Sequence, residues 1–529
     1  MTIKGKNYIG SKQSARGNKV FKTFNPVSNQ ENEYSFYEAT EEEINEAVEL
    51  AWNAFESYQN LSGERKGAFL NAIADEIESL GDELIHVYCS ESGLPAGRAA
   101  GERGRTVFQL RSFADLVIKG NWIEASIDTA QPERSPVPKP DLRKMQIGLG
   151  PVVVFGASNF PLAYSTAGGD TAAALAAGCP VIVKSHPMHA GTGELVTSAI
   201  IKAAQRTDMP DGVFSNLNSS GIEVGVSLVK HPLVKAVGFT GSLRAGRSLF
   251  DLASKREEPI PVFAEMGSVN PVVFLPEALD QRGDELSSTY AASVTLGTGQ
   301  FCTNPGLLFG IKGESLDRFI TALAEKIVEI EPGCMLHPNI VGAYETNKKK
   351  ALAQKGLALV AEYDKDIEPN VARQVVTTVE GSTFLNNPTL HQEVFGPFTM
   401  VVQCSDTEQL ENIILKLEGQ LTGTLIAGTE EARRHPGVIS ALRKRVGRII
   451  FNGVPTGVEV CPSMVHGGPY PASTDSRFTA VGINSIKRWV RPFSYQDWPD
   501  ELLPDALKNS NPLGIVRMVN NQWTTDAIE

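Results

Sequence analysis

Short apolar runs recur through the middle of the sequence, and glycine or proline bounds each of them. They occupy residues 152–155, 181–183, 236–239 and 272–274. Between them lie stretches rich in alanine and leucine, such as 171–177 and 191–204, which predict helices. Strands that alternate with helices indicate a parallel, doubly wound sheet, and the alternation continues from residue 287 to about 450. We therefore expect an α/β fold.

The size and charge of the chain narrow its class further. It has 529 residues, of which 42% are hydrophobic, so we expect two large lobes rather than one ordinary domain. A net charge of −12 argues against a nucleic-acid partner or an anionic membrane surface, because phosphates repel such a protein. The polar first 22 residues lack the apolar core of a secretory signal, and no run of about 18 apolar residues appears. We expect a cytoplasmic protein without a membrane span.

Six cysteines lie far apart in the sequence, at positions 89, 179, 302, 334, 404 and 461. None belongs to a Cys-x-x-Cys pair, so the usual zinc and dithiol sites are not expected, and we predict no metal. An even number of cysteines in so long a chain does not imply disulfides. Reduced thiols agree with the expected cytoplasmic location.

Three further local patterns bear on architecture and ligands. Thr40 and Glu43 form a capping-box pattern that opens a helix, and a second helix is expected around residues 68–80. Residues 132–144 are rich in proline and charge, which predicts an extended arm. Residues 241–248 resemble a phosphate-binding loop, but Arg247 replaces the lysine that such a loop requires. We expect no nucleoside triphosphate there, although a helix N-terminus could still offer amides to a phosphate.

Residues 299–306 are the segment that says most about chemistry. Glycines and polar residues flank Cys302, which suits an exposed thiol on a tight turn. A cysteine nucleophile needs a base or an electropositive setting to form a thiolate, and no histidine lies nearby in the sequence. Our candidate base is Glu265, because burial among apolar residues would raise its pKa toward neutrality. Taken singly, the two residues could equally be a structural cysteine and half of a buried ion pair.

The pairing of a Glu-x-Gly-x-x-x-Pro-type segment at Glu265 with Gly-Gln-x-Cys at Cys302 resembles the aldehyde dehydrogenase superfamily. Further segments match in the family's order, at 156–161, 181–184, 239–242 with Gly246, and 393–397. The resemblance covers about residues 25–489 and implies an aldehyde dehydrogenase fold. Its expected parts are a Rossmann-like nucleotide-binding lobe (1–122 and 145–265), an α/β catalytic lobe (266–465) and a small oligomerisation arm (123–144 and 485–492). The C-terminal tail, 493–529, has no expected role.

The resemblance also implies roles for individual residues. Cys302 would attack the aldehyde to give a thiohemiacetal and then a thioester, which water activated by Glu265 would hydrolyse. The Asn159 amide, with the Cys302 backbone N–H, would stabilise the oxyanion. The implied cofactor residues are Lys184 for the adenine ribose, Gly241 and Ser242 for the pyrophosphate, Glu393 for the nicotinamide ribose and Phe395 for packing against the cofactor.

The sequence departs from the family's pattern at the cofactor and in the substrate tunnel. NAD-preferring members carry a glutamate where this chain has Pro187, so a 2′-phosphate is not repelled, and His186 adds a donor. We predict NADP as the cofactor, with NAD left open. Arg105 is expected to face the tunnel mouth, where it would pair with a substrate carboxylate, and Phe160 to line the tunnel. The alternative for Arg105 is a charge on a helix surface.

Residues 263–271, 299–305 and 466–473 resemble in particular a subgroup that oxidises α-ketoglutarate semialdehyde (2,5-dioxopentanoate) to 2-oxoglutarate. We therefore expect an anionic aldehyde substrate and, from the family, a homo-oligomer, either dimer or tetramer. Three alternatives stay open: a dehydrogenase of long-chain or other aliphatic aldehydes, a non-redox cysteine acyl transferase or hydrolase, and a non-catalytic relative.

Overall fold

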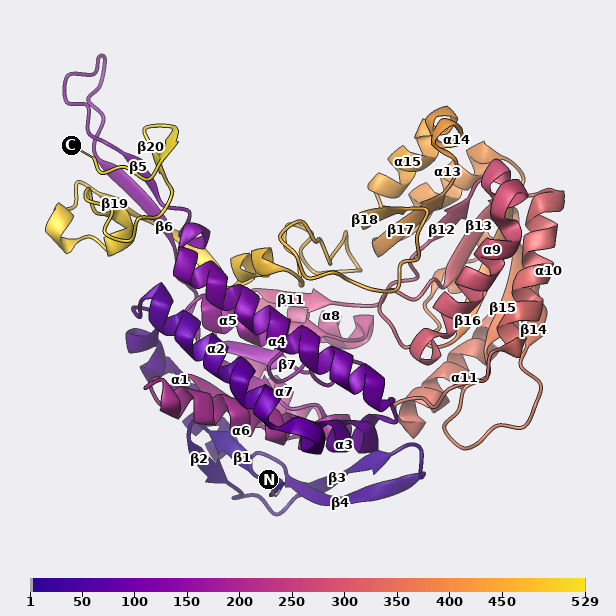
Figure 1. The fold of residues 1–529 in the computed structure, drawn as a ribbon, viewed down its shortest axis with the longest axis horizontal. Coiled ribbons are helices and arrows are strands. Elements are labelled where there is room, and N and C mark those ends of the chain that lie inside the picture. Colours follow the sequence, from indigo (N-terminus) through magenta and orange to yellow (C-terminus); the bar gives the residue numbers. More distant parts are fainter. Residues whose placement is uncertain (1–2, 529) are drawn as a thin grey trace.

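The computed structural model describes residues 3–528, which form two lobes and an arm (Figure 1). Each lobe is built on a seven-stranded sheet, and the arm carries a five-stranded sheet that extends away from both lobes. A two-stranded hairpin, β3 (Val20–Asn25) and β4 (Gln30–Tyr37), lies along the first lobe near the N-terminus. The architecture is therefore two α/β units with a separate β extension.

The first lobe is a mostly parallel sheet that buries both of its faces. In spatial order its strands are β11 (Val262–Glu265), β10 (Ala236–Thr240), β7 (Val152–Phe155), β8 (Val181–Lys184), β9 (Phe214–Leu217), β1 (Asn7–Ile9) and β2 (Lys12–Ser14). β7 to β11 pair in parallel, and β1 and β2 add antiparallel strands at one edge. Successive side chains point to opposite faces, so Val152 and Val154 enter one hydrophobic core while Val153 enters another. This burial explains the uniformly apolar runs and confirms the predicted doubly wound sheet.

Helices cover both faces of the first sheet. One face carries α2 (Gly63–Ser79), α3 (Gly81–Ser92), α4 (Ala96–Lys119), α5 (Gly169–Ala176) and α6 (Ala190–Arg206), and the other carries α1 (Glu41–Tyr58), α7 (Glu223–Lys230) and α8 (Leu243–Ser254). The predicted capping box opens α1, because Thr40 Oγ1 accepts from the Glu43 amide at 3.3 Å and Glu43 Oε2 accepts from the Thr40 amide at 2.8 Å. Amides that the first helical turn would leave unpaired are thereby satisfied.

The second lobe repeats this plan. Its strands, in spatial order, are β14 (Leu357–Glu362), β15 (Val375–Glu380), β16 (Phe398–Cys404), β13 (Leu307–Ile311), β12 (Val272–Phe274), β17 (Gln420–Ile426) and β18 (Val446–Phe451). All of them pair in parallel except β14 at one edge. One face packs against α9 (Pro276–Thr295) and α10 (Glu314–Glu329), and the other against α11 (Pro338–Leu352), α12 (Gly381–Leu385), α13 (Thr407–Lys416), α14 (Thr429–Arg434) and α15 (Pro436–Arg443).

The arm draws its strands from two distant parts of the chain. They are β19 (Val490–Gln496), β6 (Leu142–Gly148), β5 (Ser126–Asp128), β20 (Arg517–Val519) and β21 (Gln522–Thr524). The described part of the C-terminal tail thus supplies β20, β21 and most of β19 to this sheet. Ala125, Ile127, Leu503, Leu507 and Ile515 form a small hydrophobic core of its own.

The chain returns from the second lobe to the first through residues 452–489, here called the return segment. It ends in the 3₁₀ helix η5 (Ile483–Trp489) and lies along β11. There the Thr474 amide donates to the Ala264 carbonyl at 3.1 Å, and the Met266 amide donates to the Ala472 carbonyl at 2.8 Å. Residues that follow β18 by dozens of positions are therefore placed beside the end of β11.

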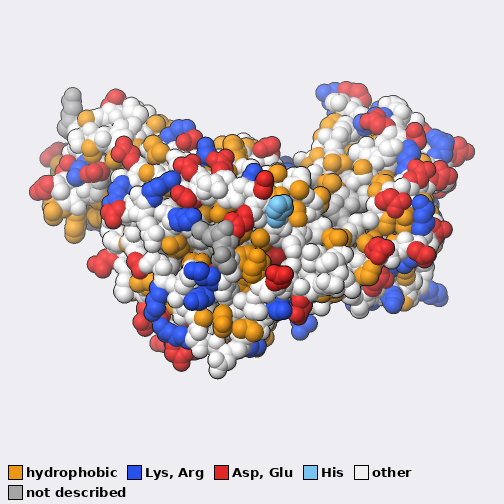
Figure 2. All heavy atoms as spheres, turned by 60° about the horizontal axis from the view of Figure 1, so that its bottom comes forward, with side chains coloured by type: hydrophobic (Ala, Val, Ile, Leu, Met, Phe, Trp, Pro, Cys, Tyr) orange, Lys and Arg blue, Asp and Glu red, His pale blue; other side chains and the backbone are white. Residues whose placement is uncertain are grey.

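The surface carries both signs of charge. On the face shown in Figure 2, acidic and basic side chains are interspersed, and the molecule is indented between the two lobes. Within residues 3–528, no helix combines the length and the hydropathy that a membrane crossing needs.

Candidate active site

A cleft of about 360 Å³ lies between the two lobes. Of the residues predicted to form the site, the cleft is lined by Asn159, Gly241, Ser242, Glu265, Cys302, Glu393 and Phe395. Lys184, His186, Arg105 and Phe160 do not line it. The structure thus brings the predicted nucleophile and the predicted base into one cavity.

The ends of parallel strands explain why these residues meet. Glu265 is the last residue of β11, Gly241 follows β10, and Asn159 lies shortly after β7. Lys184 is the last residue of β8, the next strand of the same sheet. Carboxyl ends of adjacent parallel strands lie at one edge, which is where α/β sheets bind their ligands.

The loop that carries Cys302 is held in an unusual backbone conformation. Gly297, Thr298 and Gly299 have φ of 55°, 58° and 65°, which is the left-handed region. A Cβ at Gly299 would lie 2.2 Å from the Gly396 carbonyl, so glycine is required there. Cys302 lies on a turn, as the sequence predicted, but its side chain is half-buried and not exposed, so the prediction of an exposed thiol was wrong.

Asn270, a residue without a predicted role, holds this loop through hydrogen bonds to its backbone. Its Nδ2 donates to the carbonyl oxygens of Cys302 at 2.8 Å and Asn304 at 2.9 Å. Its Oδ1 accepts from Ser268 Oγ at 2.9 Å and Thr422 Oγ1 at 3.0 Å. Asn270 also has φ of 45°, a conformation that asparagine tolerates better than most residues. The amide therefore determines where the thiol lies.

The nearest polar neighbour of the thiol is a histidine that the sequence analysis did not assign. Cys302 Sγ lies 3.6 Å from His466 Nε2, on the return segment. Burial, helped by the charges of Arg448, Arg105 and Arg488, lowers the pKa of His466 to about 3, so the imidazole is neutral near pH 7. The only sequence signal for it was the His-Gly-Gly run at 466–468, since the two residues are 164 positions apart.

The thiol itself is protonated at neutral pH. Burial raises the pKa of Cys302 to about 12, and the carboxylates of Glu265 and Glu393 raise it further. Arg105 and the Cys302 backbone N–H act in the opposite direction. An acceptor for the thiol proton is consequently needed before the sulfur can act as a nucleophile.

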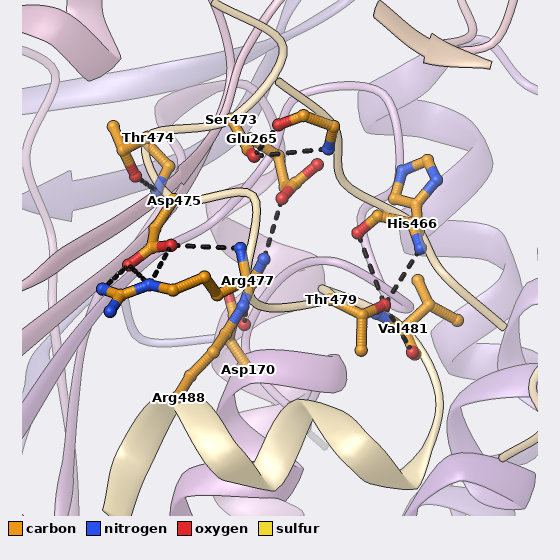
Figure 3. A network of polar contacts seen from close by, with 12 residues as sticks. Asp170, Glu265, His466, Ser473, Thr474, Asp475, Arg477, Thr479, Val481 and Arg488 are labelled. Carbon is orange, nitrogen blue, oxygen red and sulfur yellow. Dashed lines mark hydrogen bonds and ion pairs between the residues drawn. The ribbon is translucent and has the colours of Figure 1, made fainter. Parts of the chain in front are cut away.

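Glu265 is buried and bound to an equally buried arginine. Arg488 Nη2 donates to Glu265 Oε1 at 2.8 Å, and Arg488 Nη1 lies 3.2 Å from Asp170 Oδ1 at the start of α5, so that the guanidinium joins both carboxylates (Figure 3). Burial raises the pKa of Glu265 to about 7, although Arg488 opposes the rise. Glu265 Oε2 has no hydrogen-bond partner within residues 3–528. One carboxylate oxygen is thus held and the other is free.

Asn159, Phe160 and Arg105 are held by contacts with the Cys302 loop and with Tyr164. Asn159 Nδ2 donates to the Gln300 carbonyl at 3.0 Å, in the loop that precedes Cys302. Phe160 is buried, and its ring lies edge-on to Tyr164 with centroids 5.1 Å apart. Arg105, on α4, donates from Nη2 to the Tyr164 hydroxyl at 3.0 Å. Arg105 is therefore turned toward the protein interior and is not a freely solvated surface charge.

The remaining predicted residues are held by contacts with the backbone. Lys184 Nζ donates to the Ser219 carbonyl at 2.9 Å, and burial lowers the pKa of Lys184 to about 8. His186 Nδ1 accepts from the Met188 amide at 3.2 Å, which leaves Nε2 for another partner. Ser242 caps α8 by accepting from the Ala245 amide at 3.3 Å.

Glu393 lines the cleft without a cationic partner within the described residues. Burial raises the pKa of Glu393 to about 7, and a Cβ on Gly267 would lie 2.4 Å from Glu393 Oε2. A lysine at a strand end, a helix N-terminus and a free carboxylate are donors and acceptors that fit the ribose and phosphate groups of a dinucleotide.

The model of the aldehyde dehydrogenase family matches residues 12–470 of this chain. The chain is 47% identical over 519 residues to alpha-ketoglutaric semialdehyde dehydrogenase 2 of Azospirillum brasilense, covering 98% of this chain and 99% of that protein. It is 45% identical over 521 residues to alpha-ketoglutaric semialdehyde dehydrogenase of Acinetobacter baylyi, with coverage of 98% and 99%. Its fold is similar to that of betaine aldehyde dehydrogenase from Staphylococcus aureus in complex with NAD+, with a TM-score of 0.80, 19% identity, and coverage of 94% of this chain and 95% of that one.

Proposed function

The chain belongs to the aldehyde dehydrogenase family, and from this premise we propose that it oxidises α-ketoglutarate semialdehyde to 2-oxoglutarate with NAD(P)+. The family and the α/β fold predicted from the sequence are confirmed, and the family's reaction is the NAD(P)-dependent oxidation of an aldehyde. The observation that carries the site assignment is one cleft holding a free thiol and a buried carboxyl whose pKa is about 7. The substrate assignment rests on two relatives matched over nearly their whole length.

The reaction begins at Cys302. The sulfur attacks the aldehyde carbon, a C–S bond forms, and the carbonyl electron pair moves to the oxygen. Because the pKa of the thiol is about 12, its proton must pass to a base, and Glu265 in the same cleft has a pKa near 7 and a free Oε2. His466, with a pKa of about 3, cannot hold that proton and instead orients the sulfur through the 3.6 Å contact.

The oxyanion that forms is stabilised by two N–H donors. One is the Asn159 amide, which lines the cleft beside the loop of Cys302, and the other is the Cys302 backbone N–H. Each preorganised donor of this kind typically contributes about 3 kcal/mol of transition-state stabilisation. The cofactor, when bound, supplies the acceptor for the aldehyde hydrogen with its electron pair, and the enzyme is left with a thioester on Cys302.

Glu265 then completes the cycle by hydrolysis. After the proton taken from the thiol has left to solvent, the Glu265 carboxylate takes a proton from water and the water oxygen attacks the thioester carbon. The C–S bond then breaks to release the acid, and the proton on Glu265 returns to the Cys302 sulfur. Arg488 holds Oε1, so that Oε2 alone is presented to the water. A pKa near the working pH makes the carboxylate both sufficiently ionised and sufficiently basic.

We propose NADP as the preferred form of the cofactor, with Lys184 and His186 near its 2′-phosphate, Gly241 and Ser242 at its pyrophosphate, and Glu393 and Phe395 at its nicotinamide end. Support comes from Pro187, which offers no carboxylate to repel a phosphate, and from His186 Nε2 and the Lys184 ammonium, which are available as donors, although the charge of Glu38 acts on Lys184. NAD remains the alternative. The ratio of NADPH to NADH formation rates decides between them.

The lobes, the arm and the location of the protein enter the proposal as well. The first lobe (1–122, 145–265) binds nucleotide, the second (266–465) carries Cys302, and the arm (123–144, 485–492) joins subunits in a dimer or tetramer. Support for assembly comes from exposed apolar side chains on the arm and tail, namely Leu142, Phe493, Trp498 and Trp523. Six unpaired thiols suit the cytoplasm. Light scattering on the purified protein tests the assembly.

The test of the function is the initial rate of NADPH and NADH formation with α-ketoglutarate semialdehyde and with dodecanal. We expect kcat/KM for the semialdehyde to exceed that for dodecanal at least about 100-fold, because the alkyl chain of dodecanal would leave the charge of Arg105 unsolvated. Equal or better oxidation of dodecanal would establish the long-chain alternative. Release of acid without reduced cofactor would establish the non-redox hydrolase.

A further inference from the structure

Four arginines lie near the residues of the site, and two of them form ion pairs with carboxylates of the protein. Arg488 is paired with Glu265 at 2.8 Å and with Asp170 at 3.2 Å. Arg98 lies 3.6 Å from Glu102, and its guanidinium stacks over the rings of Phe160 and Phe301. These two charges serve the fold of the site.

Arg105 and Arg448 differ, because their contacts are with neutral groups. Arg105 Nη2 donates to the Tyr164 hydroxyl at 3.0 Å. Arg448, on β18, lies 3.3 Å from Met464 Sδ through Nη1 and donates from Nη2 to the Gly457 carbonyl at 3.3 Å. Within residues 3–528, neither guanidinium has a carboxylate partner, and the Nε of each is buried without any hydrogen-bond partner. Both charges are only partly exposed and stay unneutralised.

The neighbours of both guanidinium groups lie close to the thiol. Tyr164, which accepts from Arg105, and Met464, the neighbour of Arg448, pack against the same small hydrophobic cluster. The Tyr164 ring lies 6.2 Å from the His466 ring, and His466 Nε2 lies 3.6 Å from Cys302 Sγ. Tyr164 therefore links both arginines to the reacting sulfur.

The electrostatics agree with this placement. Beyond the effect of burial, the charges of Arg448 and Arg105 both lower the pKa of His466. Arg105 also opposes the rise that burial causes in the pKa of the Cys302 thiol. Burial lowers the pKa of Arg448, and the anionic forms of Cys302 and Tyr164 oppose that fall. Such coupling weakens with distance, so both cations lie close to the site of reaction.

A partly buried cation without an anionic partner destabilises the folded protein unless a bound ligand neutralises its charge. Desolvating a charge without a partner destabilises a protein, and native structures almost always pair such groups. The planar guanidinium presents two parallel N–H groups that match a carboxylate. Neither Arg105 nor Arg448 lines the cleft that holds Glu393 and Gly241, so an anion that they bind contacts groups outside that lining.

We infer that Arg105 and Arg448, with the Tyr164 hydroxyl, bind the distal carboxylate and adjacent oxo group of the substrate, and so restrict the enzyme to short aldehydes that end in a carboxylate. In α-ketoglutarate semialdehyde four C–C bonds, roughly 5 Å, separate the aldehyde carbon from the carboxyl carbon. Tyr164 accepts from Arg105, which leaves its own O–H to donate to the substrate. This inference rests on the proposed function and adds Arg448 and Tyr164 to the specificity that Arg105 alone suggested.

The test compares the semialdehyde with pentanal, which has the same number of carbons and no carboxylate. We expect Arg448→Met and Arg105→Met each to lower kcat/KM for the semialdehyde about 10- to 100-fold, the value of one or two charge-assisted hydrogen bonds. Oxidation of pentanal should change less than about 2-fold, and Arg448→Lys should lose less than Arg448→Met because the charge remains. The matched control is Arg443→Met, an exposed arginine before the same strand, for which no change is expected.

The outcomes separate this inference from the proposed function. If the semialdehyde remains a good substrate of Arg448→Met, or if that variant loses pentanal and semialdehyde oxidation equally, the carboxylate site is refuted while the proposed function stands. If the wild type instead prefers succinate semialdehyde, and the two methionine variants lose that preference, the carboxylate site stands and the proposed substrate is wrong. A wild type that oxidises pentanal as well as both acids refutes the carboxylate site and the anionic substrate together.

Discussion

The ion pair between Arg488 and Glu265 offers the sharpest perturbation of the proposed mechanism. Arg488→Met removes a charge-assisted hydrogen bond of 2.8 Å from a buried carboxylate. Such a bond is worth about 1.5–3 kcal/mol, so its loss should raise the pKa of Glu265 by about 1 to 2. Starting from a pKa of about 7, the ionised fraction at pH 7 would fall about 5- to 50-fold, and the rate of thioester hydrolysis would fall with it.

The pH dependence carries the diagnostic sign. A carboxyl must lose its proton to act as a base, so the ascending limb of kcat should move to higher pH in Arg488→Met, and activity should recover toward pH 9. In pre-steady-state experiments at pH 7 the first turnover and the steady state should both be slower than in the wild type, because Glu265 is the base for thiol activation and for hydrolysis.

The free energy of unfolding of Arg488→Met is a second readout, and it makes controls necessary. Glu265 and Asp170 would both lose their buried cation, which costs about 3–5 kcal/mol at neutral pH. The folded pKa of both carboxyls is raised by burial, so protonation relieves this cost and the loss should shrink as the pH falls toward 5. Arg488→Lys keeps a charge and should shift the limb less, and Arg477→Met, which removes an exposed arginine on the same segment, should not shift it. A folded Arg488→Met enzyme whose pH limb coincides with that of the wild type would refute the reasoning.

Three other substitutions test separate parts of the site. Asn270→Ala removes the donor that holds the Cys302 carbonyl at 2.8 Å, so we expect the free energy of unfolding to fall by about 2–3 kcal/mol and kcat to fall at least about 10-fold, by denaturant titration and steady-state rates. Gly267→Ala places a Cβ 2.4 Å from Glu393 Oε2, and it should weaken NADP+ binding about 10-fold by fluorescence titration without changing the alkylation rate of Cys302. Pro187→Glu should lower the ratio of kcat/KM for NADP+ to that for NAD+ at least about 10-fold, because the new carboxylate repels the 2′-phosphate; an unchanged ratio would place the phosphate elsewhere.

Much of the fold was predictable because its signals are local. The apolar runs at β7, β8 and β10 are buried on both faces, so they stand out without tertiary information. The same holds for the capping box at Thr40, whose two partners are three residues apart. Strands β20 and β21, by contrast, have three residues each, which is too short for any periodic pattern to identify.

The polar partners of the site were not predictable in the same way. Cys302 and Glu265 lie in recognisable segments, but His466, Arg488 and Arg448 are ordinary charged or polar residues in the sequence. Their proximity to the thiol and the carboxylate depends on where the return segment and β18 lie. His466 is 164 positions from Cys302 in the sequence, and Arg488 is 223 positions from Glu265. Arg488 fell within residues 485–492, where the predicted role was assembly, and a single sequence does not distinguish that role from an ion pair.

The most direct test of the account is to trap the covalent intermediate. Glu265→Gln lacks the base for thiol activation as well as for hydrolysis. Mixed with α-ketoglutarate semialdehyde and NADP+ at pH 9, where solvent hydroxide can take the thiol proton, it should slowly give one reduced cofactor per site and then stop. Peptide mass spectrometry after acid quench should locate the acyl group of 2-oxoglutarate on Cys302. Continued turnover, or an acyl group on another residue, would contradict the proposed roles of Cys302 and Glu265.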